Sequence, residues 1–554
     1  MQSSSLIRPD LGRRSFDVIV IGGGINGVAI ARECARGGRS VLIVEARDFA
    51  SGTTSRATRI IHGGLRYLEH GEVGLVRESL RERERLLRER PHLVRPMKFV
   101  LAMSRDGGLL RSAGAVRFGL WLYERWTGAR GARCAVDSHC LEALLDSGTG
   151  LQLFDYEDAQ CEFPERLVAE WLGEALQAGA IARNYTEVLE IIVRDAQAQG
   201  IRVRDKLSGS ESEIRGRWII NATGPWADIM CSRSNIKQRR MVGGVKGSHI
   251  VLPRFTSLAE TGALTSAVYA EAEDKRPIFV VPWAEQVLVG TTEVAYDGDP
   301  AEAAITADET QYLLRAVQRL FPRERITEGG SAVRAAYSGV RPLPYSPGKP
   351  ASSVTRRSYL HDHLEDGTAH LISVIGGKLT TASSLARECA RKIGVNVADR
   401  DALVAIGPGD GIASALSQWT RAMARKCDVS EETALAVAQW HGRAARRILK
   451  AAASSREMSE RLCPHTAHIA AEAHYAFTEE CATSLADVLL RRVPLAMGAC
   501  WSRACAQHAS RAVATLMGWS EAQRRLELAR FEQERARFLG VAPQPAPELA
   551  GAVA

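Results

Sequence analysis

Three glycines and one acid near the start of the chain have the types and spacing needed to bind a dinucleotide. Gly22, Gly24 and Gly27 form a Gly-x-Gly-x-x-Gly motif, and Glu45 follows it along the chain. In such a motif the first glycine makes a tight turn, the second lets the backbone approach a pyrophosphate, and the third lets the next helix pack closely on the sheet. The later acid accepts hydrogen bonds from a ribose. The motif predicts a dinucleotide site; the alternative is a glycine-rich turn in an unrelated α/β domain.

The elements that must position these residues are a strand, a helix and a second strand. The apolar run at 16–21 is typical of a buried parallel strand. A helix is expected to start near Ile25, with its N-terminus pointing at the phosphate. Residues 40–44 predict the second strand, which ends at Glu45. This order of elements indicates an α/β fold.

Later segments predict more strands and a second domain. Residues 217–225 indicate a strand ending in a Gly-Pro turn, and residues 371–381 indicate a buried strand, a glycine turn and a helix starting near Leu379. Apolar runs at 278–283 and 287–292, joined by a short polar turn, predict a hairpin. Antiparallel strands away from the nucleotide-binding unit predict a second domain that covers the substrate.

Length and composition limit the class of protein. With 554 residues the chain is too long for one core, so two or three domains are expected. The polar start of the chain, residues 1–14, has no apolar segment typical of a secretory signal. The 11 cysteines include no Cys-x-x-Cys pair. Their pattern argues against a zinc site or redox dithiol, so no metal is expected, and it fits reduced thiols in a protein facing the cytosol.

The net charge of +8 is compatible with nucleic acid, anionic lipid or a small anionic substrate as partner. No dense tract of Lys and Arg stands apart from acids, so nucleic acid is not expected. Residues 77–90 alternate Arg and Glu at helical spacing, which predicts a solvated, ion-paired helix face. Residues 111–130 combine Phe118, Trp121 and Trp126 with basic flanks, a pattern that suits a helix lying in a membrane interface. The alternative is an amphipathic helix packed on its own core.

Several segments share, in order, the motifs of one flavoprotein family. The segments are 21–27, 61–70, 221–226, 246–250, 273–276, 290–293, 337–343 and 376–381. Together they resemble the FAD-dependent, membrane-associated glycerol-3-phosphate dehydrogenases, which belong to the glycine/D-amino-acid oxidase-like flavoproteins. The His-Gly-Gly-Leu-Arg-Tyr, Ser-Gly-Val-Arg-Pro and Gly-Gly-Lys-Leu-Thr segments are the most specific. The resemblance covers about residues 16 to 390, and the lack of an EF-hand loop makes it a resemblance to the bacterial type.

The resemblance implies a fold of three parts: a Rossmann-like FAD-binding domain of the glycine/D-amino-acid oxidase type, an antiparallel-sheet substrate domain and a C-terminal helical domain. We expect the FAD-binding domain to comprise 16–90, 150–240 and 331–395. The substrate domain would comprise 91–149 and 241–330, and the helical domain 396–540. Residues 1–15 and 541–554 are expected to be a disordered arm and tail.

The resemblance also implies non-covalently bound FAD. The expected cofactor-binding residues are Gly22, Gly24, Asn26, Gly27, Glu45, Ser55, His62, Gly63, Gly64, Leu65, Ala222, Thr223, Gly224, Gly377, Lys378, Leu379 and Thr380. A helix N-terminus after Gly377 would stabilise negative charge on the reduced ring.

A phosphorylated substrate requires cations, and arginine binds phosphate oxygens bidentately. Candidates are Arg66, Arg341 and Arg356, and the alternative for each is an ordinary surface charge. Lys378 is expected to add a point charge at the flavin or the substrate; its alternative is an exposed lysine at a helix start.

His249, at the start of an apolar strand, is the candidate to accept the hydroxyl proton because its ordinary pKa lies near neutral pH. The alternative is a core histidine with its hydrogen bonds satisfied. His62 adjoins two glycines and is expected along the flavin. Tyr67 is expected to hydrogen-bond the substrate.

The activity implied by the resemblance is oxidation of sn-glycerol 3-phosphate to dihydroxyacetone phosphate, with electrons passing to a membrane quinone. The protein would then lie at the cytoplasmic face of the inner membrane, against its lipid surface, or in the cytoplasm. The alternatives left open are a glycerol-3-phosphate oxidase that uses oxygen, a related amine or amino-acid oxidoreductase, and a non-catalytic flavin-binding protein. Whether the chain forms a homodimer is also open.

Overall fold

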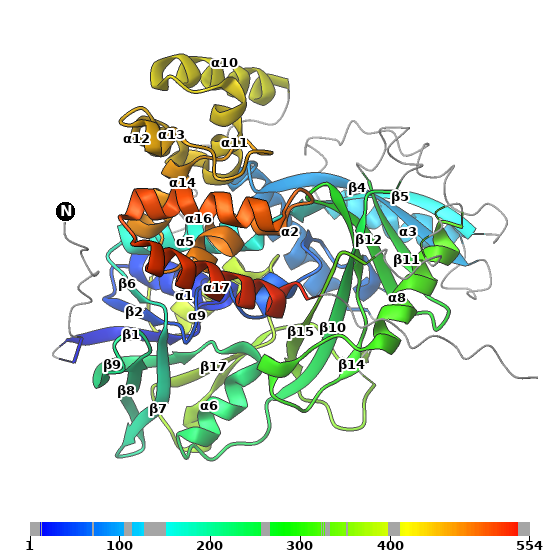
Figure 1. The fold of residues 1–554 in the computed structure, drawn as a ribbon. Coiled ribbons are helices and arrows are strands. Elements are labelled where there is room, and N and C mark those ends of the chain that lie inside the picture. The colour runs from blue at the N-terminus through cyan, green and yellow to red at the C-terminus, as the bar shows by residue number, and fades with distance from the viewer. Residues whose placement is uncertain are drawn as a thin grey trace, which may run out of the picture.

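Two mixed sheets lie side by side, and helices from the end of the chain pack above the helical layer of the first sheet and against the core of the second (Figure 1). The computed structural model describes residues 11–12, 14–68, 71–104, 113–126, 151–255, 266–322, 324, 326, 333–350, 353–396 and 410–540. Predicted features within 1–10, 105–112, 127–150, 397–409 and 541–554 lie outside the described residues, including most of the predicted arm and all of the tail.

The first sheet has the strand order β16-β17-β9-β1-β2-β6, with the hairpin β7–β8 attached to β9. Its strands are β1 (Ser15–Ile21), β2 (Val41–Val44), β6 (Ile181–Arg183), β7 (Thr186–Arg194), β8 (Gln197–Asp205), β9 (Glu211–Asn221), β16 (Tyr359–Asp362) and β17 (Leu371–Ile375). The central strands β17, β9, β1, β2 and β6 are parallel. Their carboxyl ends therefore meet at one edge, where ligands of open α/β sheets bind.

The second sheet has the order β14-β10-β13-β12-β11-β4-β5-β3, with β15 paired to β10. Its strands are β3 (Ile60–Ile61), β4 (Val94–Ser104), β5 (Leu151–Cys161), β10 (Val242–Pro253), β11 (Ala267–Glu271), β12 (Pro277–Trp283), β13 (Gln286–Gly290), β14 (Val294–Ala295) and β15 (Ala335–Pro344). The antiparallel pair β12–β13 confirms the predicted hairpin.

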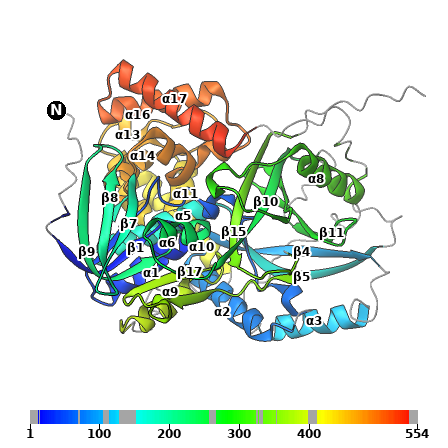
Figure 2. The same cartoon turned by 90° about the horizontal axis from the view of Figure 1, so that it is seen from below.

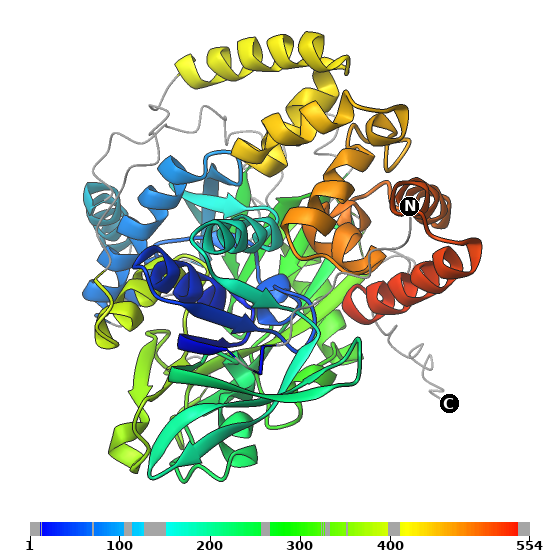
Figure 3. The ribbon, with the colours of Figure 1, turned by 90° about the vertical axis from the view of Figure 1, so that its left-hand side faces the viewer.

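Helices pack on both sheets and form a separate group at the end of the chain (Figures 1 and 3). Those before residue 400 are α1 (Ile25–Arg36), α2 (Val73–Glu89), α3 (Ala113–Trp126), α5 (Pro164–Gln177), α6 (Ala227–Arg233), α8 (Ala307–Leu320) and α9 (Ala382–Lys392). The later ones are α10 (Asp410–Cys427), α11 (Glu431–His441), α12 (Ala445–Ala452), α13 (Arg456–Ser459), α14 (Ala470–Glu479), α15 (Leu485–Asp487), α16 (Arg503–Met517) and α17 (Glu521–Phe538). A π-helical turn, Val488–Arg492, follows α15. The helix predicted from Leu379 begins at Ala382, after a turn.

The chain crosses between the two sheets more often than the expected domain boundaries allow. β5 and β15 were expected in the FAD-binding domain, but they pair with β4 and β10 in the second sheet. β5 belongs to the second sheet because it pairs with β4 along its whole length, in one antiparallel ladder from Val94↔Cys161 to Ser104↔Leu151. The backbone N–H and C=O groups of these long strands find their hydrogen-bond partners in each other, so the two strands lie in the same sheet.

The prediction that residues 77–90 form a solvated helix face is wrong for its central arginine. Arg83 on α2 is 3% exposed, and it donates a hydrogen bond of 2.5 Å to the buried Asp158 of β5. Arg90, just past the helix, is also buried, and it pairs with Glu170 and Glu174 of α5. Because α2 packs against β4 and β5, one side of its charged surface is enclosed, and buried charges persist when they are paired.

Helix α3 has one face in the core and one in solvent, on the outside of β4 and β5 (Figure 2). Leu120 and Tyr123 are buried, whereas Phe118 and Trp121 are 62% and 56% exposed. Trp126 is partly buried beneath the guanidinium of Arg77. The core alternative therefore holds for the inner face, and the outer face leaves two aromatic rings exposed.

Within the described residues, no helix combines the length and the apolar character that crossing a bilayer requires.

Candidate functional site

A cavity of about 610 Å³ lies where the two sheets meet, and most of the predicted site residues line it. One end is formed by the glycine turn after β1 and the end of β2. The other end is formed by β10, β15 and the glycine turn after β17, and carries cationic side chains. We call these the dinucleotide end and the ring end.

At the dinucleotide end, the three glycines of the motif have different physical roles. Gly22 has a φ of +109°, and a Cβ there would lie 2.5 Å from the Ala222 carbonyl oxygen. A Cβ on Gly27 would lie 1.9 Å from the Gly22 oxygen, so this glycine serves packing and does not line the cavity. Gly24 caps α1, and the nearest atom to a Cβ there is the Thr54 hydroxyl at 3.3 Å. It leaves the space above the helix N-terminus open to a ligand.

Glu45 lies at the end of β2, beside the same turn. Its carboxylate accepts a 2.7 Å hydrogen bond from the Gly23 amide and a 2.9 Å bond from the Arg47 amide. Burial raises the pKa of Glu45, and the two backbone donors oppose that effect. Each carboxylate oxygen has a second lone pair for a ribose hydroxyl, so its geometry is compatible with the predicted contact.

Asn26 joins the two glycine turns of the first sheet. Its amide donates to the Gly376 carbonyl oxygen at 3.2 Å, while its own Oδ1 is buried without a hydrogen-bond partner. Gly377 has a φ of +95°, and a Cβ there would strike the Asn26 amide at 2.3 Å. The turn after β17 therefore needs a glycine for both conformation and space.

The segment after β3 lies beside this turn. The His62 amide donates to the Thr380 hydroxyl at 3.2 Å. Burial, and then the charge of Lys378, lowers the pKa of His62 to about 3, so its ring is neutral at pH 7. Of the predicted cofactor residues in and near this segment, His62, Gly64 and Leu65 line the cavity. So do Ala222, Thr223, Gly224, Gly377, Lys378, Leu379 and Thr380.

Two further predicted contacts, Ser55 and Gly63, do not line the cavity. The buried Ser55 hydroxyl donates to the Ala50 carbonyl oxygen at 2.7 Å. The Gly63 amide donates to the Tyr123 hydroxyl at 2.8 Å and faces the core beneath the loop. Both residues shape the loops that line the cavity from behind.

The ring end gathers most of the predicted cations. Arg341 of β15 donates to the Thr291 hydroxyl at 2.8 Å, and burial lowers its pKa to about 10, with Arg356 adding to that effect. Arg356 is paired with Glu293. Burial lowers the pKa of Lys378 to about 7, and its ammonium lies 4.1 Å from the centre of the Tyr67 ring.

Arg66, the remaining predicted cation, also lines the cavity and is partly exposed.

His249 lies on β10 in the wall of the same cavity. Its Nε2 is 2.9 Å from the Thr58 hydroxyl, its ring stacks on Tyr337 at 4.9 Å, and its Nδ1 is buried without a partner. Burial, followed by the charge of Arg341, holds the pKa of His249 well below its usual value. The imidazole is therefore neutral at pH 7, with a lone pair free for a proton, but it is a weaker base than the near-neutral pKa assumed from the sequence would make it.

Three residues that no sequence pattern singled out hold the predicted ones in place. Thr58 orients His249, Thr291 orients Arg341, and Glu293 neutralises Arg356. Thr291 and Glu293 stand in a matching segment, 290–293, and Thr58 ends a loop rich in Ser and Thr. None of these patterns shows which side chain the residue binds in the folded protein.

The residues present fit an FAD molecule extended along the cavity. The glycine turn and Glu45 suit its adenosine and pyrophosphate. Unpartnered buried atoms, Asn26 Oδ1 and Lys378 Nζ, and the Nδ1 of His249 supply polar groups toward the ring end.

Comparison with known proteins adds independent findings. The model of the FAD dependent oxidoreductase family matches residues 17–392, and that of the C-terminal domain of alpha-glycerophosphate oxidase matches residues 372–524. The chain is 38% identical over 517 residues to a glycerol-3-phosphate dehydrogenase of Synechocystis sp., covering 88% of this chain and 90% of that one. It is 39% identical over 377 residues to a D-erythritol 1-phosphate dehydrogenase of Brucella abortus, covering 67% and 72%.

The fold is also similar to a solved structure. That structure is the glycerol-3-phosphate dehydrogenase from Bacillus halodurans complexed with FAD, with a TM-score of 0.73 and 24% identity, covering 95% of this chain and 96% of that one. This likeness and the family matches confirm the predicted fold class.

Proposed function

Because the chain belongs to the FAD-dependent oxidoreductase family, and within it to the glycerol-3-phosphate dehydrogenases, we propose that it oxidises sn-glycerol 3-phosphate to dihydroxyacetone phosphate. The observation that carries the proposal is the presence of two half-buried cations, Arg341 and Lys378, and one neutral imidazole, His249, in the wall of one cavity. Bound FAD would supply the hydride acceptor.

The substrate phosphate is assigned to Arg341 first. Its side chain is half-buried and its guanidinium donates to the Thr291 hydroxyl, which leaves most of its five N–H donors for phosphate oxygens. Lys378 adds a second positive charge whenever it is protonated. Arg356 is already neutralised by Glu293, so it contributes less to the phosphate and more to the shape of the site.

His249 is assigned the hydroxyl proton. As the substrate carbon gives up its hydride, the hydroxyl oxygen must lose a proton and becomes the ketone oxygen of the product. A neutral imidazole accepts that proton, and Thr58 holds the ring in place. The nearby charge of Arg341 lowers the basicity of His249 and favours release of the proton after turnover.

The electron acceptor that we propose is a membrane quinone. The support is the outer face of α3, where Phe118 and Trp121 are exposed and stack with ring centres 5.7 Å apart. Aromatic rings on an amphipathic helix favour a position in a lipid interface. The protein would then be peripheral, at the cytoplasmic face of the membrane. Oxygen as acceptor remains the competing proposal, and direct assay distinguishes the two.

A second candidate substrate is D-erythritol 1-phosphate, because the chain is 39% identical to an enzyme named for it. Both substrates carry a phosphate, so the same cations serve either one, and they differ in the length of the polyol.

The experiment is anaerobic reduction of the purified, flavin-loaded protein. Rapid bleaching of the flavin absorbance by sn-glycerol 3-phosphate, and only slow bleaching by glycerol, is the expected result. Faster bleaching by D-erythritol 1-phosphate would assign the longer substrate, and bleaching by an amino acid alone would overturn the proposal. Adding a quinone analogue or oxygen to the reduced protein then identifies the acceptor by the rate of reoxidation.

A further inference from the structure

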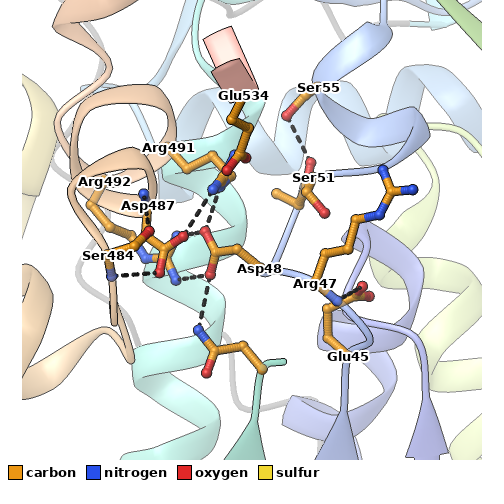
Figure 4. A network of polar contacts seen from close by, with 12 residues as sticks. Glu45, Arg47, Asp48, Ser51, Ser55, Ser484, Asp487, Arg491, Arg492 and Glu534 are labelled. Carbon is orange, nitrogen blue, oxygen red and sulfur yellow. Dashed lines mark hydrogen bonds and ion pairs between the residues drawn. The ribbon is translucent and has the colours of Figure 1, made fainter. Parts of the chain in front are cut away.

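A buried carboxylate ties the loop after β2 to the C-terminal helices (Figure 4). Asp48 is 1% exposed, and its carboxylate accepts hydrogen bonds of 2.7 and 2.8 Å from the two terminal nitrogens of Arg492. Arg491 donates to the same carboxylate, and Asn184 donates at 3.2 Å. Burial alone would raise the pKa of Asp48, but Arg492 and Arg491 lower it to about 2, so the group is ionised at neutral pH.

The two arginines are held independently by their own side of this contact. They are neighbours in the π-helical turn Val488–Arg492. Arg491 also donates to Asp487 at 2.9 Å and to Glu534 of α17 at 2.7 Å. The Nε of Arg492 donates to the Glu480 carbonyl oxygen at 3.0 Å. Their positions are therefore set by the helical domain, and Asp48 is the group brought to them.

The opposite side of the same loop is bound to the glycine turn. The Ala50 amide donates to the Gly23 carbonyl oxygen at 2.9 Å, and Glu45 accepts from the Gly23 amide at 2.7 Å. Ala50 has a φ of +65°, in the left-handed region that non-glycine residues rarely adopt. Such a conformation persists only where surrounding contacts hold it. A shift of the loop would therefore move both the ribose-binding acid and the turn that faces the pyrophosphate.

We propose that Asp48, Arg491 and Arg492 position the adenosine end of the cofactor site, so that the C-terminal helical domain contributes to FAD affinity through the loop after β2. They act as positioning residues, since none of the three lines the cavity. Removing the charge of Asp48 leaves two adjacent buried guanidinium groups without their shared counter-charge, and an uncompensated buried charge is strongly unfavourable. The loop is expected to relax away from the arginines, and Glu45 moves with it. The inference depends on FAD binding and not on the identity of the substrate.

The test is Asp48→Asn in the full-length chain, stripped of FAD and titrated with it while flavin fluorescence is followed. We expect the Kd for FAD to rise at least tenfold. ADP carries the adenosine and pyrophosphate without the ring, so its Kd, measured by competition, should rise by a similar factor. At saturating FAD, kcat and the KM for substrate should stay within twofold, because the ring end does not touch this loop. A general loss of structure would change those two constants as well.

Two further variants complete the test. Glu534→Gln removes the outer, partly exposed partner of Arg491 and leaves the Asp48 contacts in place, so FAD affinity should stay within twofold. Arg492→Lys keeps the charge but loses the bidentate pair, and it should raise the Kd at least threefold. If Asp48→Asn yields no soluble protein, the Kd of Arg492→Lys for FAD is the deciding measurement. Wild-type affinity for FAD and ADP in the soluble Asp48 and Arg492 variants, or a loss for FAD without one for ADP, would overturn the proposal.

Discussion

Replacing Arg341 with Ala should weaken binding of a phosphorylated substrate by a large and specific factor. The side chain of Arg341 is half-buried, and its guanidinium donates to the Thr291 hydroxyl at 2.8 Å. Within the described part of the chain no carboxylate forms an ion pair with it, whereas Arg356 is paired with Glu293. The charge pair that the substitution removes is that of Arg341 with the substrate phosphate. Truncating one member of such a hydrogen-bonded charge pair costs about 2 to 4 kcal/mol. At about 1.4 kcal/mol per factor of ten, kcat/KM should fall between about thirtyfold and a thousandfold.

The assay is the rate of flavin reduction in the absence of oxygen, measured over a range of sn-glycerol 3-phosphate concentrations. Because Arg341 is assigned to the phosphate, the loss should lie mainly in KM. Slow reduction by glycerol, which has no phosphate, should be nearly unchanged. Arg341→Lys keeps the charge without the planar fork, so it should recover part of the loss.

The matched control is Arg357→Ala, which removes an exposed arginine next to Arg356 and should leave the kinetics within twofold. It also tests the register, since the sequence alone does not distinguish Arg356 from its neighbour. An Arg341→Ala protein with unchanged KM would refute the assignment of the phosphate. An equal loss with glycerol would show that Arg341 acts on the flavin or on the fold instead.

Three further predictions concern the cofactor, the pH dependence and the membrane. Gly24→Val should fold, because φ at this position is −75°, which other residues adopt. It should purify without FAD, because the new side chain projects into the space expected for the pyrophosphate. A yellow variant would contradict this. Since burial lowers the pKa of Lys378 to about 7, its cation is lost as the pH rises above that value. We expect kcat/KM to fall from pH 7 to pH 9 and to stay level in Lys378→Arg; a level wild-type profile would argue against a role for this charge. Replacing Phe118 and Trp121 together with Ser should release the protein from anionic liposomes without lowering its melting temperature, and retained binding would place the membrane contact elsewhere.

The sequence predicted the parts of the site that depend on local backbone chemistry. The turns at Gly22, Gly24 and Gly377 need particular conformations or space, so their residue types reveal them. It failed where a side chain is defined by a distant partner. The tie between Asp48 and Arg491 spans hundreds of residues, and neither residue stands in a recognisable motif.

The pattern of charges along a helix likewise did not predict which of them are buried. The alternating Arg and Glu of α2 suggested a solvated face, yet Arg83 is buried against Asp158, which comes from β5. Periodicity reports how a helix could distribute its charges and not which neighbour covers it. Likewise, the expected domain boundaries followed chain order, whereas β15 joins the second sheet because its register with β10 is continuous from Val242 to Val251.

Because the cavity lies between two sheets, its geometry depends on hydrogen bonds that join segments of one sheet to segments of the other. The dinucleotide end belongs to the first sheet, and Arg341 and His249 belong to the second. Hydride transfer requires close and aligned reactants, and a misplacement of about 1 Å costs about a hundredfold in rate. Packing of each sheet on its own does not fix the relation between them. Hydrogen bonds that cross from one sheet's segments to the other's do, as when the His62 amide donates to the Thr380 hydroxyl or the Thr53 hydroxyl donates to the Val340 carbonyl oxygen. Substitutions at such bridges should therefore lower turnover more than their small effect on stability would suggest.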